Sequence, residues 1–365
     1  LKDPKKSMSV ISLIKSMSSQ SMEEMSIPCF DNEPLSDLHK ATEIVSFHEL
    51  IKKANKTSNK SEQIIYLLAY HISPFIENIG RIKKPFGGLL GETYEYTDGS
   101  LKCIVEQVSH NPSICAFHFE SEDHISQGTY NATVNISLKK GVDIITDLRF
   151  KTTLKSSGDT FSMSYPKIEL RNVFLGKTHA YLVGKTTVTN DSNGESGYIE
   201  YLPEGRNSKN SYGLIGKVFD SKDKETYSLS GRFDKELFAT KVGSSEPVLI
   251  TEKSLPRPKD DHMNYNFTIF SLNLNHLGPK VLAKIPSSDT RLRPDIHAYE
   301  YGDNDLAEKE RLRLEKKARA LASTNWKPLW FDHYPQDYLQ YRFNNKYWNI
   351  RVIGKGNNPV PNGMG

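Results

Sequence analysis

Between residue 90 and about residue 275, hydrophobic and polar side chains alternate with a period of two, which is typical of β-strands with one buried face. The alternation is clearest where one face would carry Tyr130, Ala132, Val134, Ile136 and Leu138 and the other Thr129, Asn131, Thr133, Asn135 and Ser137. Short polar segments separate such runs and predict turns. A long antiparallel meander usually curls or closes to remove its edges, and a barrel of this size has room for a ligand inside.

Two helices are predicted before the meander, over residues 35–50 and 61–80. The second is clearer, because it carries a stripe formed by Ile64, Ile65, Leu68, Ile72, Phe75, Ile76 and Ile79. Asn59 and Glu62 have the spacing of an N-terminal cap and its partner. We interpret His71, within this helix, as a packed core histidine and not as a ligand-binding one.

After the meander, residues 303–323 predict a highly charged helix. Asp305 and Glu308 have the spacing of its N-terminal cap pair. Charges of both signs along the helix are typical of a solvated face joined by i,i+4 ion pairs. The following segment, Trp326 to Val352, is rich in aromatic residues, and we expect it to pack back on the barrel.

Near the start of the chain, residues 8–17 carry one apolar stripe. Its members, at the i, i+3, i+4, i+7 spacing of a helix face, are Val10, Leu13, Ile14 and Met17. A helix of about ten residues is not stable alone in water, so this one must dock on something apolar. Two interpretations stay open: a helix packed on its own core, and a lid or membrane-surface helix.

A polar turn follows the predicted strand Cys103–Val108. The turn spans Ser109–Ser113, and its proline biases the preceding residue towards extended backbone. Its hydrogen-bond donors are Ser109, His110 and Asn111. The turn either ends the strand and nothing more, or it presents these donors to the head group of a ligand.

Composition narrows the class of protein. Charged residues make up 25% of the chain and hydrophobic residues 37%, as in ordinary soluble globular proteins. A net charge of +4 suits mild attraction to anionic surfaces and does not indicate a nucleic-acid partner. The sequence has no apolar run of about 18 residues and no signal-peptide pattern. Three cysteines without metal-binding spacing favour a reducing, cytosolic setting. Because the chain starts at Leu1, we expect it to be an excerpt of a longer protein.

Motifs for catalysis are missing from the sequence. It contains no Gly-X-Ser-X-Gly elbow, no His-Glu-X-X-His and no Cys-X-X-Cys. Gly184-Lys185-Thr186 is similar to the end of a phosphate-binding loop, but His179 stands where that loop needs a glycine. We therefore expect a binding or carrier protein without cofactor or metal, and not an enzyme.

The octapeptide Glu106–Ser113 resembles Glu-Gln-Val-Ser-His-His-Pro-Pro, a motif of the oxysterol-binding-protein-related lipid-transfer family, at six of eight positions. Other segments that resemble the family are Asp31–Ser36, Lys84–Glu92, Ser230–Asp234, Ser288–Asp295, Leu329–Phe331 and Tyr347-Trp348. Together with the stripe at residues 8–17, they follow the family's order along nearly the whole chain. Chance is a poor explanation for this agreement.

The resemblance implies an α+β, mainly β fold. We expect a near-closed, many-stranded antiparallel β-barrel around a lipid tunnel, with an N-terminal lid helix, further N-terminal helices and a charged C-terminal helix. Residues 1–30 would form the lid and linker, and residues 31–365 one lipid-transfer domain. The lid face would consist of Val10, Leu13, Ile14 and Met17.

The resemblance also implies binding of phosphatidylinositol 4-phosphate and its exchange for a second lipid, a sterol or phosphatidylserine. The head-group contacts that it implies are Lys84, His110 and Asn111, together with Arg311, Glu315 and Arg319 from the charged helix. The last three lie at i, i+4 and i+8, on one stripe that spans roughly 12 Å. Two guanidiniums with a carboxylate between them suit a phosphorylated inositol.

The chain departs from the family pattern at this site. Arg311 stands where the family has lysine, Asn111 replaces a histidine, and Gly87 and Gly88 replace Asn-Pro. Successive N–H groups in glycine-rich turns can form an anion-binding nest. Our hypothesis is that the backbone donors of Gly87 and Gly88 replace part of the contact that the missing asparagine amide would make.

We expect a monomer that acts at anionic membrane surfaces on the cytosolic side, at endoplasmic reticulum contact sites, and transfers lipid between membranes. The alternative is a phosphoinositide-dependent lipid sensor or scaffold without net transfer.

Overall fold

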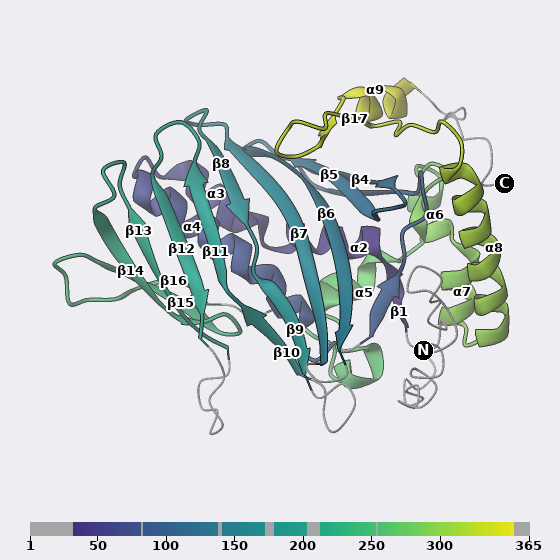
Figure 1. The fold of residues 1–365 in the computed structure, drawn as a ribbon, viewed down its shortest axis with the longest axis horizontal. Helices are drawn as coiled ribbons and strands as arrows, with labels where there is room; N and C mark the ends of the chain where they lie inside the picture. The colour runs from purple at the N-terminus through teal and green to yellow at the C-terminus, as the bar shows by residue number, and fades with distance from the viewer. Residues whose placement is uncertain are drawn as a thin grey trace.

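The computed structural model describes residues 32–81, 83–137, 141–171, 179–202, 212–252 and 255–353. Its centre is one large antiparallel sheet (Figure 1) with the strand order β16-β15-β14-β13-β12-β11-β8-β7-β6-β5-β4-β3. Strand β9 pairs with β7, and β10 with β9. The strands are β3 (Thr93–Asp98), β4 (Leu101–Ser109), β5 (Ile114–Glu120), β6 (His124–Ser137), β7 (Gly141–Leu154), β8 (Thr160–Ser164), β9 (Lys167–Arg171), β10 (His179–Val183), β11 (Lys185–Asn190), β12 (Ser196–Tyr201), β13 (Gly213–Phe219), β14 (Glu225–Arg232), β15 (Glu236–Lys241) and β16 (Val248–Glu252). The predicted meander is confirmed. Within the described ranges β3 and β16 do not pair with each other, so the sheet is barrel-like without closing.

The main core lies between the sheet and the helices α3 (His48–Lys56) and α4 (Lys60–Ile72), which lie behind the strands in Figure 1. Alternate residues of the strands point inward and are fully buried, among them Phe150, Phe161, Met163 and Val188. Helix α4 approaches β12 so closely that a Cβ at Gly197 would lie 2.8 Å from Cγ2 of Ile64. Only glycine fits there without a shift of the helix.

The helix predicted over residues 35–50 is confirmed from Asp37 onward, but as three consecutive pieces: α2 (Asp37–Thr42), the 3₁₀ helix η2 (Glu43–Phe47) and the start of α3. The prediction is wrong for Leu35 and Ser36, which belong to the strand β1 (Asn32–Ser36). Strand β1 pairs in parallel with β2 (Lys84–Phe86), a partner far away in sequence that local periodicity does not reveal. Ser36 then begins α2, because its Oγ accepts a hydrogen bond from the backbone N–H of His39 (3.4 Å).

The second predicted helix is confirmed as α4, although it is shorter than expected. Oδ1 of Asn59 accepts a hydrogen bond from the N–H of Glu62 (3.3 Å), as the cap spacing predicted. The α-helix ends at Ile72 and continues as the 3₁₀ helix η3 (Ser73–Asn78). Pro74 explains the change, since it has no backbone N–H to continue the α-helical ladder.

The last strand of the sheet ends at Glu252. The sequence analysis expected strands to about residue 275, which is too far. Short helices follow: η4 (Asp261–Asn264), α5 (Ile269–Leu274), α6 (Pro279–Leu282), η5 (Thr290–Leu292) and α7 (Pro294–Glu300). Thr268 begins α5, because its Oγ1 accepts a hydrogen bond from the N–H of Ser271 (3.1 Å).

The predicted charged helix is confirmed as α8 (Asn304–Ala322). Its cap is Asp303 and not Asp305, since Oδ1 of Asp303 accepts a hydrogen bond from the N–H of Leu306 (3.0 Å). The side chains that α8 buries are Ala307, Arg311, Leu314 and Ala318. Hence a single charged residue lies within an otherwise apolar contact face.

The aromatic tail packs on the outer part of the sheet, as predicted. It forms β17 (Phe331–His333), β18 (Tyr341–Phe343) and α9 (Lys346–Ile353), which lie along one edge of the molecule above β4 and β5 (Figure 1). One apolar cluster joins the two parts and contains Trp330, Phe331, Tyr341, Phe343 and Tyr347 together with Ile104, Val108, Ile114 and Ala116. In the described ranges, no helix is both long enough and apolar enough to cross a membrane.

Candidate functional site

The polar turn between β4 and β5 is held by a side chain beneath it. Nε2 of Gln107 donates hydrogen bonds to the carbonyl of Ser109 (2.8 Å) and to Oγ of Ser113 (3.0 Å). These two bonds brace both ends of the turn. His110 is half-buried and Asn111 is exposed, so both can meet a ligand from solvent.

The loop after β2 lies beside this turn. The N–H of Gly91 donates to the carbonyl of Gln107 (3.0 Å), and the N–H of Gln107 donates to the carbonyl of Glu92 (2.9 Å). Lys84, at the start of β2, is exposed. The segment Lys84–Glu92 and the turn that carries His110 are therefore fixed next to each other.

Helix α8 completes the arrangement. Leu89, in the loop after β2, forms a small buried cluster with Leu314 and Ala318 of α8. Glu315 lies next to this contact in the sequence, and Arg319 is exposed. The structure thus places the Lys84 loop between the β4–β5 turn and α8, three segments that are remote in sequence.

Ion pairs within α8 hold the guanidinium of Arg311. Its Nη2 lies 2.6 Å from Oε1 of Glu308, and its Nη1 lies 2.5 Å from Oε1 of Glu315. The Arg311 side chain is only 6% exposed. Helix α8 places Arg311, Glu315 and Arg319 at i, i+4 and i+8, but the sequence did not predict that Glu308 would share the charge of Arg311.

The peptide group between Gly87 and Gly88 is held from both sides. The carbonyl of Gly87 accepts a hydrogen bond from Nη1 of Arg293 (2.7 Å), and the N–H of Gly88 donates to Oδ2 of Asp37 (3.1 Å). This second bond contradicts the hypothesis of a glycine nest at Gly88, because a carboxylate already uses that donor. A Cβ at Gly88 would lie 2.0 Å from Oε1 of Gln107, so the close approach requires glycine.

A cavity of about 110 Å³ lies between the helical segments and the inner face of the sheet. Its lining is mostly apolar and consists of Lys40, Ala41, Glu43, Ile44, Pro74, Phe75, Asn78, Phe117, Tyr130, Leu148, Tyr165, Pro166 and Ile168. An apolar body with one polar end is the kind of ligand that such a lining suits.

His71 lies next to this cavity, with its ring centroid 4.7 Å from that of Tyr165. It is fully buried, as the sequence predicted, and burial lowers its pKa to about 3. Neither ring nitrogen of His71 nor the hydroxyl of Tyr165 has a hydrogen-bond partner within the described part of the chain. Buried polar atoms without partners are uncommon in folded proteins.

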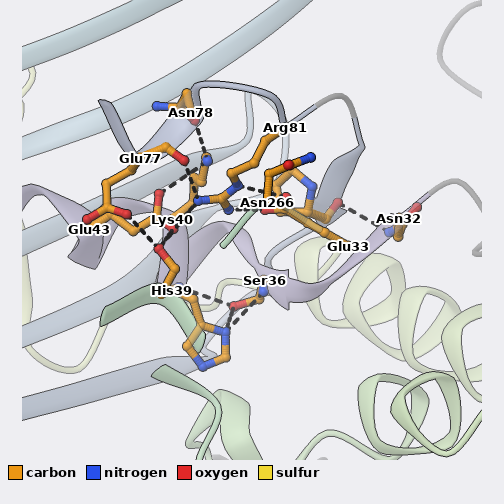
Figure 2. A network of polar contacts seen from close by, with 12 residues as sticks. Asn32, Glu33, Ser36, His39, Lys40, Glu43, Glu77, Asn78, Arg81 and Asn266 are labelled. Carbon is orange, nitrogen blue, oxygen red and sulfur yellow. Dashed lines mark hydrogen bonds and ion pairs between the residues drawn. The ribbon is translucent and has the colours of Figure 1, made fainter. Parts of the chain in front are cut away.

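Sequence reasoning missed a buried ionic network that borders the cavity, whose lining includes Lys40, Glu43 and Asn78. Arg81 lies between Glu33 and Glu43, with its Nε 3.0 Å from Oε2 of Glu33 and its Nη1 2.5 Å from Oε1 of Glu43 (Figure 2). Lys40 lies 3.2 Å from Glu43 and also binds Asn78. The network joins β1 to the residues just before β2. Its only signal in the sequence is a set of charged residues within otherwise apolar stretches.

Glu106 is also buried and charged, and the sequence did not predict what its side chain binds. Its Oε1 accepts a hydrogen bond from the N–H of Leu329 (2.8 Å), and its Oε2 accepts one from the N–H of Trp330 (3.0 Å). Burial raises the pKa of Glu106 to about 8. The first residue of the octapeptide therefore attaches the aromatic tail to the strand that carries the turn.

The structure brings most of the predicted site residues into one region. The turn with His110 and Asn111 is joined to the loop with Lys84 and the glycines through Gln107, and Leu89 of that loop packs on Leu314 and Ala318 of α8. The predicted lid residues lie outside the described part of the chain; they are Val10, Leu13, Ile14 and Met17.

Comparisons with known proteins agree with this geometry. The chain is 31% identical over 371 residues to oxysterol-binding protein-related protein 1B of Arabidopsis thaliana, a match that covers 97% of this chain and 74% of the relative. It is 29% identical to oxysterol-binding protein homolog 1 of Saccharomyces cerevisiae, covering 93% of this chain and only 32% of that longer protein. The chain therefore spans about a third of the yeast homolog.

Solved structures give the same result. The Osh3 ORD of Saccharomyces cerevisiae in complex with PI(4)P is 25% identical, with a TM-score of 0.85 over 97% of this chain and 95% of that chain. The Osh1 ORD domain in complex with cholesterol is also 25% identical, with a TM-score of 0.85 over 97% of this chain and 90% of that chain. The family model described as oxysterol-binding protein matches residues 9–352. The chain belongs to the oxysterol-binding protein family.

Proposed function

We propose that this chain binds phosphatidylinositol 4-phosphate at the site formed by the Lys84 loop, the β4–β5 turn and α8, and exchanges it for a second lipid between membranes. The observation that carries the proposal is the convergence of these three segments, each of which presents polar donors beside an apolar core. The related Osh3 domain has been solved with PI(4)P. We place the activity at cytosolic membrane faces, at contacts with the endoplasmic reticulum, and we propose that a monomer performs it.

A sterol is the second lipid that the cavity favours over phosphatidylserine. The cavity lining is mostly apolar, and the unpartnered atoms of His71 and Tyr165 beside it suit one hydroxyl group and not a charged head group. Pockets for drug-sized ligands start at about 300 Å³. Because this cavity measures about 110 Å³, entry of a sterol requires lining side chains to move. The Osh1 domain has been solved with cholesterol and with ergosterol.

Replacing His110 and Asn111 together by alanine tests the head-group site. Each lost charge-assisted hydrogen bond is worth roughly 1.5–3 kcal/mol, so extraction of the phosphoinositide from liposomes should weaken at least about tenfold. Both residues lie on a surface turn, and thermal unfolding should change little. Lys235→Ala is the matched control, because this exposed lysine lies between β14 and β15, two strands at the other end of the sheet from α8 (Figure 1). Undiminished extraction by the double variant would contradict the assignment.

Transfer between two liposome populations separates a carrier from a sensor or scaffold. A carrier moves the phosphoinositide to acceptor liposomes and should do so faster when these contain a sterol. A sensor extracts or binds the lipid without delivering it. Extraction with no delivery over many turnovers would favour the sensor and contradict exchange.

A further inference from the structure

Asp37 is the first residue of α2 and enters the head-group region from the side of β1. Its side chain is half-buried, and its Oδ2 accepts the hydrogen bond from Gly88. On the other side of the same peptide group, Arg293 donates to the carbonyl of Gly87. An anion and a cation thus clamp one peptide group, which fixes the direction of the loop that starts at Lys84.

The two charged residues of this clamp, Arg293 and Asp37, differ in the charged groups that surround them. Arg293 lies 3.1 Å from Glu92 and 2.5 Å from Asp295, so its charge is matched by its own partners. Burial raises the pKa of Asp37, while the hydrogen bond from Gly88 and the nearby charges of Lys84 and Arg293 act against that rise. Ser36, the residue before Asp37, pairs with Phe86 in the parallel β1–β2 ladder, so the start of α2 lies beside the short strand that carries Lys84. The carboxylate of Asp37 therefore lies within electrostatic reach of Lys84.

We propose that Asp37 is an affinity-tuning residue of the head-group site: its oxygen positions the Gly87–Gly88 peptide group, and its negative charge competes with the lipid phosphate for Lys84. The proposal rests on the proposed function. The two roles use different properties of one side chain. Positioning needs only a hydrogen-bond acceptor, whereas competition needs the charge.

Two substitutions separate the roles. Asn in place of Asp37 keeps an oxygen that can accept from Gly88 and removes the charge, so Asp37→Asn should bind phosphatidylinositol 4-phosphate about fivefold more tightly. Ala removes both and leaves the Gly88 N–H without its acceptor, so Asp37→Ala should bind about threefold or more weakly than Asp37→Asn. Affinities are measured by extraction from liposomes of neutral lipid with a small fraction of the phosphoinositide.

The dependence of lipid affinity on salt concentration distinguishes a charge effect of Asp37 from a purely structural role. Interactions between partly exposed charges are screened as ionic strength rises. The advantage of Asp37→Asn over the wild type should therefore shrink between low salt and about 0.5 M salt. Asp98→Asn removes the same charge from the exposed far end of the β3–β4 hairpin and should leave affinity unchanged.

The outcomes separate this inference from the function on which it rests. If the wild type extracts the phosphoinositide but Asp37→Asn binds equally or more weakly, the tuning role is overturned and the proposed function stands. If neither the wild type nor Asp37→Asn extracts it, the proposed function fails and the inference fails with it. Tighter binding by Asp37→Asn, lost again in Asp37→Ala, supports both.

Discussion

Glu106 is a single residue at which the turn-bearing strand and the aromatic tail meet, and its removal should destabilise the whole molecule. Glu106→Ala leaves the N–H groups of Leu329 and Trp330 without their acceptors. Unsatisfied buried donors cost about 1–3 kcal/mol each. We expect the free energy of unfolding, measured by urea denaturation, to fall by about 2–4 kcal/mol. Glu106→Gln, which can still accept one of the two bonds, should lose less. Equal stability of all three proteins would show that the two bonds contribute nothing.

His71 should make the protein less stable in acid. Its pKa is about 3 in the folded protein, against about 6.5 when unfolded. The unfolded chain therefore binds more protons between these values, and stability is lost as pH falls from about 6.5 towards 3. Between pH 7 and pH 5 the loss should be roughly 2 kcal/mol. His71→Leu should remove this part of the pH dependence, as urea denaturation at both pH values would measure.

The control for this prediction is His262→Leu, which changes an exposed histidine and should leave the dependence of stability on pH unchanged.

Glu106 changes stability with pH in the opposite direction. Its pKa is raised to about 8, so its contribution is present below about pH 4.5 and is lost as pH rises through about 8. Only the difference between His71→Leu and the wild type isolates His71. A slope that stays the same in His71→Leu would contradict the assignment.

At the scale of the elements, the sequence predicted well those helices and strands that depend on residues close together in the chain. The stripe and cap of α4, the alternation of the strands and the existence of α8 all follow from residues within one turn or one pleat of each other. Strand β1 was not predicted, because it exists only through pairing with β2. The cap of α8 was predicted two residues too late, because Asp305 is followed by Glu308 at the spacing of a capping box, whereas Asp303 has Leu306 at that position.

The loop after β2 should tolerate the family's asparagine but not its proline. At Gly88, a proline would have no N–H for Asp37, and its ring would meet the side chain of Gln107, where even a Cβ would lie 2.0 Å from Oε1. Gly88→Pro should therefore lower the free energy of unfolding by about 2–4 kcal/mol. Thermal unfolding or urea denaturation would measure the loss.

Gly87→Asn is the matched comparison for this loop. A Cβ at Gly87 meets nothing within 4 Å, so stability should change by no more than about 0.5 kcal/mol. If Gly88→Pro were as stable as Gly87→Asn, the hydrogen bonds from the Gly87–Gly88 peptide group to Asp37 and Arg293 would not determine the conformation of the loop. Restoring both family residues at once would combine the two effects and would not distinguish them.

At the scale of the whole molecule, the sequence predicted the residues of the proposed head-group site but not the contacts that connect their segments. Lys84, the β4–β5 turn and the α8 stripe were found by resemblance, residue by residue. Leu89 against α8, Asp37 on Gly88 and the network around Arg81 connect segments that are remote along the chain. No periodicity or spacing contains that information, because each contact depends on how the sheet curves.

The apolar stripe at residues 8–17 should control release of bound lipid. Burying four such side chains over a bound lipid would contribute about 1.5–3 kcal/mol for each one fully buried, so deleting residues 1–26 should speed lipid loss at least about tenfold. The deletion leaves β1 in place, which Glu33 anchors through its ion pair with Arg81. Replacing Leu13 and Ile14 by serine should reproduce the effect, whereas Lys15→Ala, off the stripe, should not. The rate is followed by transfer of a fluorescent lipid from loaded protein to empty liposomes. Unchanged release in the deletion variant would show that the stripe does not act as a lid.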